Sequence, residues 1–165
     1  MPTTPGMEVA AAVASQILVA AKQNGGVQQR LHFFMKKKIL FVCIENSNRS
    51  QMAEAFATML LGGSVAAYSA GSSPSGKINP KAISAMAELG YDLTTHYSKS
   101  LDEVKAIAPF DIVITMGCED ACPWMPAKKF LDWDIPDPRD MEKTQFNEVR
   151  DTIRSRVLTL LNDPI

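Results

Sequence analysis

The stretch that decides the fold is Lys38–Ala57, which reads KILFV (38–42), CIENSNRS (43–50) and QMAEAFA (51–57). The first segment is a continuous apolar run, which predicts a strand buried on both faces. The last segment predicts a helix, so the eight residues between them form a strand-to-helix loop. The backbone N–H groups of such a loop, together with the positive end of the helix, can surround a tetrahedral oxyanion.

Cys43 and Arg49 give this loop its expected chemistry. The guanidinium of Arg49 is a planar fork that can bind two oxygens of an anion. Cys43 stands at the base of the loop as a nucleophile, and a field that attracts anions also favours the reactive thiolate. A lone cysteine here would indicate a buried structural residue. The arginine six positions later, with Ser50 beside it and the flanking strand and helix, favours a catalytic cysteine instead.

The composition bounds the class of protein. At 165 residues the chain suits one domain, and its 46% hydrophobic and 21% charged residues are typical of a globular protein. A net charge of -1 predicts neither nucleic-acid binding nor binding to an anionic membrane. Three cysteines are too few for a secreted disulfide framework, so we expect a reducing, cytoplasmic location. Zinc-ligand spacing is absent from the sequence, and no metal is expected.

Residues 1–34 differ in composition from the rest. Val9–Ala21 is rich in alanine and favours a helix, but it is shorter than the roughly 20 residues that span a bilayer. Glu8 precedes it, where a secretory signal would carry positive charge. We therefore expect an N-terminal extension over 1–34, loosely ordered or helical, and a catalytic domain over 35–165.

The rest of the chain alternates predicted strands and helices. We expect strands at Ile39–Val42, Val65–Ser69, Asp111–Met116 and Lys129–Trp133. We expect helices at Gln51–Leu61, Pro80–Leu89, Leu101–Ile107 and Gln145–Leu161. Helical spacing predicts buried faces made by Met52, Phe56, Met59 and Leu60, and by Phe146, Val149, Ile153, Val157, Leu160 and Leu161. The alternation predicts an α/β fold, a three-layer sandwich around a four-stranded parallel sheet, with the ligand beyond the carboxyl ends of the strands.

Cys118 and Cys122 follow the third predicted strand, so Cys118 belongs at the same sheet edge as Cys43. On a regular helix, residues four apart hold their Cβ atoms about 5–6 Å apart. A disulfide needs about 3.5–4.5 Å. The pair can therefore oxidise where the segment bends or forms a loop. We favour a redox role over the alternative that both are incidental small residues.

A general acid is also required, because a leaving group that departs as an oxyanion needs a proton. Asp137 is the candidate, since Pro138 holds it extended on a proline-stiffened loop. The neighbouring carboxylates are interpreted as solvated loop charge: Asp132, Asp134 and Asp140. His32 and His96 each lack a partner at ligand spacing, so surface or capping positions are expected for them.

With these residues in hand, the chain resembles the low-molecular-weight protein tyrosine phosphatase superfamily, from about Lys37 to the C-terminus. Within it, the chain looks most like the arsenate reductases. The resemblance rests on Cys43–Ser50, Ser50–Glu54, Tyr68–Gly71, Asn79–Ala82 and Cys118…Cys122-Pro123 followed by Asp137-Pro138. It implies a low-molecular-weight tyrosine phosphatase-like fold and a catalytic set made by Cys43, Arg49, Ser50, Cys118, Cys122 and Asp137.

The resemblance implies a relay of three thiols. Cys43 would attack arsenate, and Asp137 would protonate the departing hydroxyl. Cys118 would then attack Cys43, releasing arsenite, and Cys122 would attack Cys118. The resulting 118–122 disulfide would be reduced by thioredoxin. The anion would be held by the loop residues Ile44, Glu45, Asn46, Ser47, Asn48 and Arg49.

Several expectations follow from where this sequence departs from the family pattern. The short spacing of Cys118 and Cys122 leaves glutaredoxin with glutathione as an alternative reductant. Glu45, which stands where many members carry glycine, is expected to point outward. Lys99 stands about where some members offer an acidic residue to potassium, so a bound cation near Asn46, Glu54 and Ser69 is not expected. We also expect no bound cofactor, and we expect a monomer. The alternatives are a tyrosine phosphatase that hydrolyses a phosphocysteine with water, and a non-catalytic anion-binding module.

Overall fold

The computed structural model describes residues 36–118 and 122–162, and the larger of its two compact units begins at Lys37. The N-terminal extension expected over 1–34 lies outside the described residues. Within the described part of the chain, no helix has both the length and the apolar character needed to cross a bilayer.

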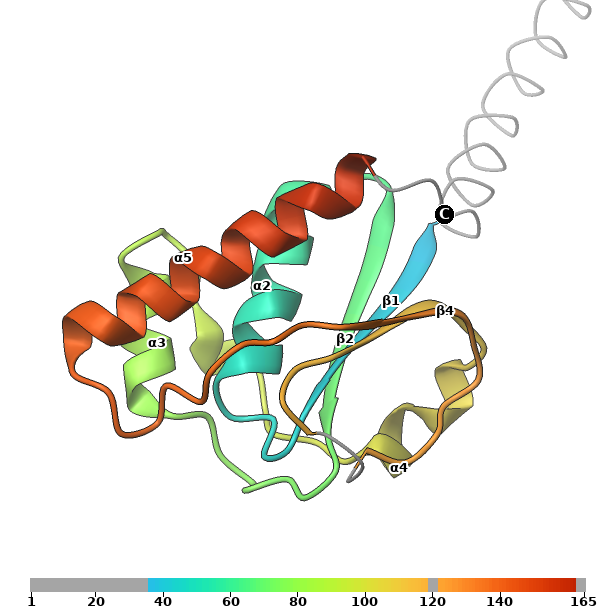
Figure 1. The fold of residues 1–165 in the computed structure, drawn as a ribbon, viewed down its shortest axis with the longest axis horizontal. Helices are drawn as coiled ribbons and strands as arrows, with labels where there is room; N and C mark the ends of the chain where they lie inside the picture. The colour runs from blue at the N-terminus through green and yellow to red at the C-terminus, as the bar shows by residue number, and fades with distance from the viewer. Residues whose placement is uncertain (1–35, 119–121, 163–165) are drawn as a thin grey trace, which may run out of the picture. The chain divides into compact units, whose positions relative to one another are not determined.

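A four-stranded sheet forms the centre of the fold (Figure 1). Its strands are β1 (Lys37–Cys43), β2 (Val65–Gly71), β3 (Phe110–Thr115) and β4 (Ala127–Asp132). The strands lie in the order β2-β1-β3-β4, and every neighbouring pair is parallel. Each expected strand is present, and none of its ends moves by more than two residues. The register pairs Cys43 with Gly71 and Val42 with Thr115, which brings the carboxyl ends of the three strands to one edge.

The named helices are α2 (Arg49–Leu61), α3 (Pro80–Ala87), α4 (Leu101–Val104) and α5 (Lys143–Thr159). Local sequence explains where two of them begin. Asn79 caps α3 by accepting a hydrogen bond from the backbone of Lys81. At the start of α4, Ser100 and Glu103 form a reciprocal capping box. The helix expected over Leu101–Ile107 is α4 followed by a 3₁₀ turn.

The two faces of the sheet carry separate cores because side chains alternate along β1. Ile39 and Phe41 belong to the core that α2 and α5 cover, and both are fully buried. Leu40 and Val42 belong to the opposite core, which includes residues of α4 and also Cys118. Figure 1 shows α2 and α5 lying together on one side of the sheet. This layering confirms the expected three-layer α/β fold.

Two of the residues predicted for buried helix faces are exposed instead. Met59 on α2 is 41% exposed, although Met52 and Phe56 of the same predicted face are at most 1% exposed and pack in the core together with Ala53 and Ala57. Leu161 is 60% exposed, because α5 ends at Thr159 and Leu161 lies in the 3₁₀ turn that follows. The tighter winding of that turn moves Leu161 off the α5 face.

Candidate active site

The loop between β1 and α2 turns its backbone around an empty centre. The carbonyls of four loop residues accept hydrogen bonds from the segment 72–79: Cys43, Ile44, Glu45 and Ser47. In a planar trans peptide the N–H points opposite to the carbonyl, so the N–H groups that follow them face the middle of the loop. Asn46 makes the turn with a φ of 50°. The loop therefore forms a cradle of amides, and such a cradle can surround an anion.

A directed chain of hydrogen bonds ends on the sulfur of Cys43. The side-chain amide of Asn46 donates to Ser50 Oγ at 2.8 Å, and Ser50 Oγ lies 2.9 Å from Cys43 Sγ. Since Ser50 already accepts from Asn46, its own hydrogen is available to the sulfur. Asn46 and Ser50 are fully buried, and Cys43 itself is 3% exposed. The arrangement therefore places a hydroxyl donor against the sulfur.

Arg49, the first residue of α2, is fixed from two sides. Its Nη1 donates to the carbonyl of Ile135 at 3.0 Å, and its Nη2 lies 3.6 Å from Asp137 Oδ2. Gly117 approaches so closely that a Cβ there would collide with Arg49 Nη1. The guanidinium is therefore held in place before any anion arrives.

A small cavity brings together most of the residues that the sequence predicted for the site. It has a volume of about 10 Å³ and is lined by Cys43, Ile44, Glu45, Ser47, Asn48, Arg49, Asp137 and Arg139. Asn46 and Ser50 do not line it; they lie behind the loop and act on Cys43. The buried Oδ1 of Asn48 has no hydrogen-bond partner among the described residues.

Cys118 and Cys122 form a disulfide, with their Cα atoms 5.7 Å apart. Neither residue belongs to a named helix or strand, as the sequence geometry required for oxidation. Cys118 is 2% exposed, and Cys122 is partly exposed. Because Cys118 directly follows Gly117, the disulfide begins one residue from the contact with Arg49. Of the three cysteines of the chain, Cys43 is the free one.

The hydrogen-bond chain behind Cys43 includes residues that the sequence analysis missed. Gln51 Nε2 donates to Asn46 Oδ1 at 2.8 Å, which leaves Gln51 Oε1 as the acceptor for His96 Nδ1 at 2.9 Å. The other ring nitrogen of His96 lies 2.8 Å from the hydroxyl of Tyr91. A neutral ring fits this chain, and burial lowers the pKa of His96. The expected capping position is confirmed for His96, which is the C-cap residue of the 3₁₀ turn Leu93–Thr95, but the part its ring plays in this chain was not foreseen. His32 lies outside the described residues.

The side chain of Lys99 reaches residues of α2 and β2. Its ammonium lies 3.6 Å from Glu54 Oε2 and 3.3 Å from Ser69 Oγ, and it is largely buried. Lys99 also donates from its backbone to Asn46 Oδ1 at 2.9 Å. Among the described residues, no cluster of three or more histidine, cysteine, aspartate or glutamate side chains could hold a metal ion.

The chain belongs to the low molecular weight phosphotyrosine protein phosphatase family, which matches it over residues 38–163. Its sequence is similar to those of arsenate reductases within that family. It is 41% identical to an arsenate reductase of Staphylococcus epidermidis over 128 residues, which are 75% of this chain and 95% of the relative.

Solved structures agree with this likeness. One is an arsenate reductase in a phosphate-binding state, with 37% identity and a TM-score of 0.70, covering 76% of this chain and 97% of the other. Another is a thioredoxin-dependent arsenate reductase of Corynebacterium glutamicum, with 35% identity and a TM-score of 0.64. That match covers 77% of this chain and 61% of the other.

Proposed function

We propose that this protein is an arsenate reductase that converts arsenate to arsenite through Cys43, Cys118 and Cys122. The observation that carries the proposal is the Cys118–Cys122 disulfide, which begins beside Arg49 while Cys43 stays free at the base of the anion cradle. A phosphatase would need the cradle, but it has no use for an oxidised pair at its edge.

The first step forms a bond between sulfur and arsenic. Cys43 thiolate attacks arsenate, which is held by the loop amides and Arg49, and one hydroxyl leaves as water after Asp137 supplies a proton. Asp137 suits this role because it borders the cavity and lies 3.6 Å from Arg49. Ser50 supports the step by donating to the sulfur.

The second step moves two electrons to arsenic. Cys118 thiolate attacks the sulfur of Cys43, the sulfur–arsenic bond breaks with its electron pair on arsenic, and arsenite leaves. Cys122 thiolate then attacks Cys118, which frees Cys43 and forms the 118–122 disulfide seen in the structure. Each exchange requires an attacking thiolate within reach of the previous sulfur.

An external dithiol closes the cycle, and we propose thioredoxin for this role. One of the similar structures is described as thioredoxin-dependent, which supports the choice. Glutaredoxin with glutathione is the alternative reductant. A cytoplasmic location belongs to the same proposal, because a thiol relay needs a reducing compartment. A single chain carries all the groups of the relay, so a monomer suffices.

The test measures arsenate-dependent NADPH consumption with thioredoxin and thioredoxin reductase. We expect turnover by the wild type and its loss in Cys118→Ser and Cys122→Ser. Both variants should still hydrolyse a small aryl phosphate, because Cys43, Arg49 and Asp137 are untouched. Hydrolysis without arsenate turnover under thioredoxin or glutathione would instead identify a phosphatase.

A further inference from the structure

The mouth of the anion cavity is crossed by an ion pair between two separate segments. Arg139 Nη2 lies 3.0 Å from Glu45 Oε1 of the loop after β1. The same Nη2 lies 3.3 Å from Asp137 Oδ2, which in turn lies 3.6 Å from Arg49. Glu45 and Arg139 both line the cavity and both are partly exposed, so their pair lies on the solvent side of the cavity.

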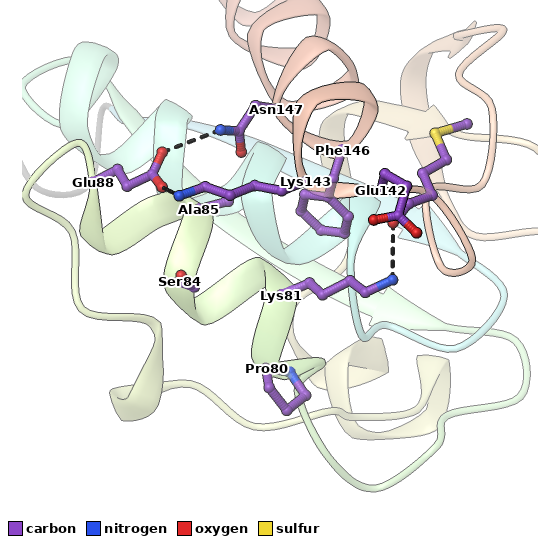
Figure 2. A pocket seen from close by; sticks show the side chains of 10 residues that line it. Pro80, Lys81, Ser84, Ala85, Glu88, Glu142, Lys143, Phe146 and Asn147 are labelled. Carbon is purple, nitrogen blue, oxygen red and sulfur yellow. Dashed lines mark hydrogen bonds and ion pairs between the residues drawn. The ribbon is translucent and has the colours of Figure 1, made fainter.

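Both ends of this bridge are anchored by their backbones. The carbonyl of Glu45 accepts from Ser98 Oγ at 2.8 Å. The carbonyl of Arg139 accepts from Lys81 Nζ at 2.9 Å, and Figure 2 shows the Lys81 side chain extended from α3 toward the segment before α5. The side chains of Glu45 and Arg139 are 31% and 48% exposed, so they can separate to admit a solute. The anchored backbones keep the two side chains within reach of each other.

The cavity is small and partly open. Its volume of about 10 Å³ matches roughly one water molecule, so a larger anion has to move the side chains that line it, Glu45 and Arg139 among them. A tetrahedral anion seated on the loop points one substituent outward, toward Asp137 and the mouth. In an inorganic oxyanion that substituent is an oxygen or a hydroxyl. In a phosphomonoester it carries an organic group that must pass between Glu45 and Arg139.

We propose that the Glu45–Arg139 ion pair determines substrate class, selecting inorganic tetrahedral oxyanions over organic phosphomonoesters. The pair closes over an anion whose outward substituent is a hydroxyl, and an ester holds it open. This inference deepens the proposed function and rests on the anion cavity at Cys43, but it does not depend on the thiol relay. Glu45 and Arg139 are specificity-determining residues in this scheme, whereas Asp137 remains the proton donor.

Binding can be measured without any turnover. In the oxidised protein Cys43 is the free cysteine, so alkylation by iodoacetamide reports on this cavity alone. Protection by inorganic phosphate and by benzylphosphonate, a stable phosphomonoester analogue, yields two dissociation constants. Their ratio, benzylphosphonate over phosphate, measures the discrimination and cancels the general effect of altered charge.

We expect the ratio to fall about two- to fivefold in Glu45→Gly and in Arg139→Ala, the range that a partly exposed ion pair supports. In the double variant the ratio should fall no further than in the single variant with the lower ratio, because both changes remove the same ion pair. Lys143→Ala is the matched control. It breaks the exposed ion pair between Lys143 and Glu88 (Figure 2), away from the cavity, and should keep the wild-type ratio.

Unchanged ratios in Glu45→Gly and Arg139→Ala would overturn the proposal, and so would a wild type that neither anion protects. Failure of the proposed function gives a different result from failure of this inference. If arsenate is not reduced with any thiol donor, yet the ratio falls in both variants, the thiol relay is wrong and the specificity role of the ion pair stands.

Discussion

At the scale of single residues, the reactivity of Cys43 depends on which way neighbouring hydrogens point. Asn46 donates to Ser50, which leaves the Ser50 hydrogen for the sulfur. Gln51 orients Asn46, and His96 orients Gln51. Protonating His96 would turn its Nε2, which faces the Tyr91 hydroxyl, from an acceptor into a donor. That hydroxyl would then have to accept a hydrogen bond instead of donating one.

The stability of the fold should therefore depend on pH through His96. Burial lowers its pKa, although Glu54 acts in the opposite direction. Below the ordinary histidine value of about 6.5, the unfolded chain binds more protons than the folded one. The contribution is thus fully present above about pH 6.5 and is lost as the pH falls below it.

Urea unfolding at pH 7.5 and pH 5.5 measures this effect. We expect His96→Gln to show a smaller loss of unfolding free energy on acidification than the wild type. His32→Gln, at the other histidine of the chain, should keep the wild-type loss. Equal losses in all three proteins would show that His96 does not carry the pH dependence.

At the scale of elements, the carboxyl ends of the parallel strands bring distant segments together. β1 supplies Cys43, β2 ends at Gly71 beside it, and the segment after β3 supplies Gly117 and Cys118. Gly117 has a φ of 68° and packs against Arg49, so its lack of a side chain serves both its turn and the guanidinium.

Gly117→Ala should therefore affect stability and anion binding together. A non-glycine residue in this conformation costs about 1–2 kcal/mol of unfolding free energy. The added Cβ also displaces Arg49, which should weaken phosphate binding by about tenfold or more, since a hydrogen bond to a charged group contributes about 1.5–3 kcal/mol.

Gly90→Ala is the matched control for this prediction. Gly90 has a φ of 82°, and a Cβ there would meet open space. It should lose similar stability by denaturant unfolding but keep the wild-type affinity for phosphate by calorimetry. Equal phosphate affinities in the two variants would contradict a role of Gly117 in placing Arg49.

At the scale of the whole molecule, the two cores support different parts of the site. The core on one face includes residues of α2, the helix that carries Arg49, and the core on the other face includes Cys118. Met125 packs in the second core and Ile153 in the first, and each is at most 2% exposed. Removing a side chain from the second core should therefore affect the 118–122 disulfide, and removing one from the first core should not.

Met125→Ala and Ile153→Ala should each cost about 2–5 kcal/mol of unfolding free energy. Met125→Ala alone should speed the reduction of the 118–122 disulfide by dithiothreitol, because it removes packing around Cys118. Thiol quantification against time measures the rate, and chemical denaturation measures the stability. Faster reduction in Ile153→Ala than in Met125→Ala would contradict this division.

Periodicity and spacing in the chain determined the parallel α/β fold, the anion loop and the edge at which Cys43 and Cys118 belong. These features depend on neighbouring residues, since the local sequence is enough to indicate a buried strand and a strand-to-helix loop. The Met59 prediction was wrong because periodicity alone does not say which positions of a predicted helix face the neighbouring elements will cover: Met52 and Phe56 are buried, and Met59 is not.

Tertiary structure alone decided which distant groups act on the sulfur and across the mouth of the cavity. His96 is 45 residues from Gln51, and Arg139 is 94 residues from Glu45, so nothing near either residue in the sequence indicates its partner. Hydrogen bonds and ion pairs act over a few ångströms. Remote segments come within that distance of each other when the folded sheet brings its strand ends to one edge.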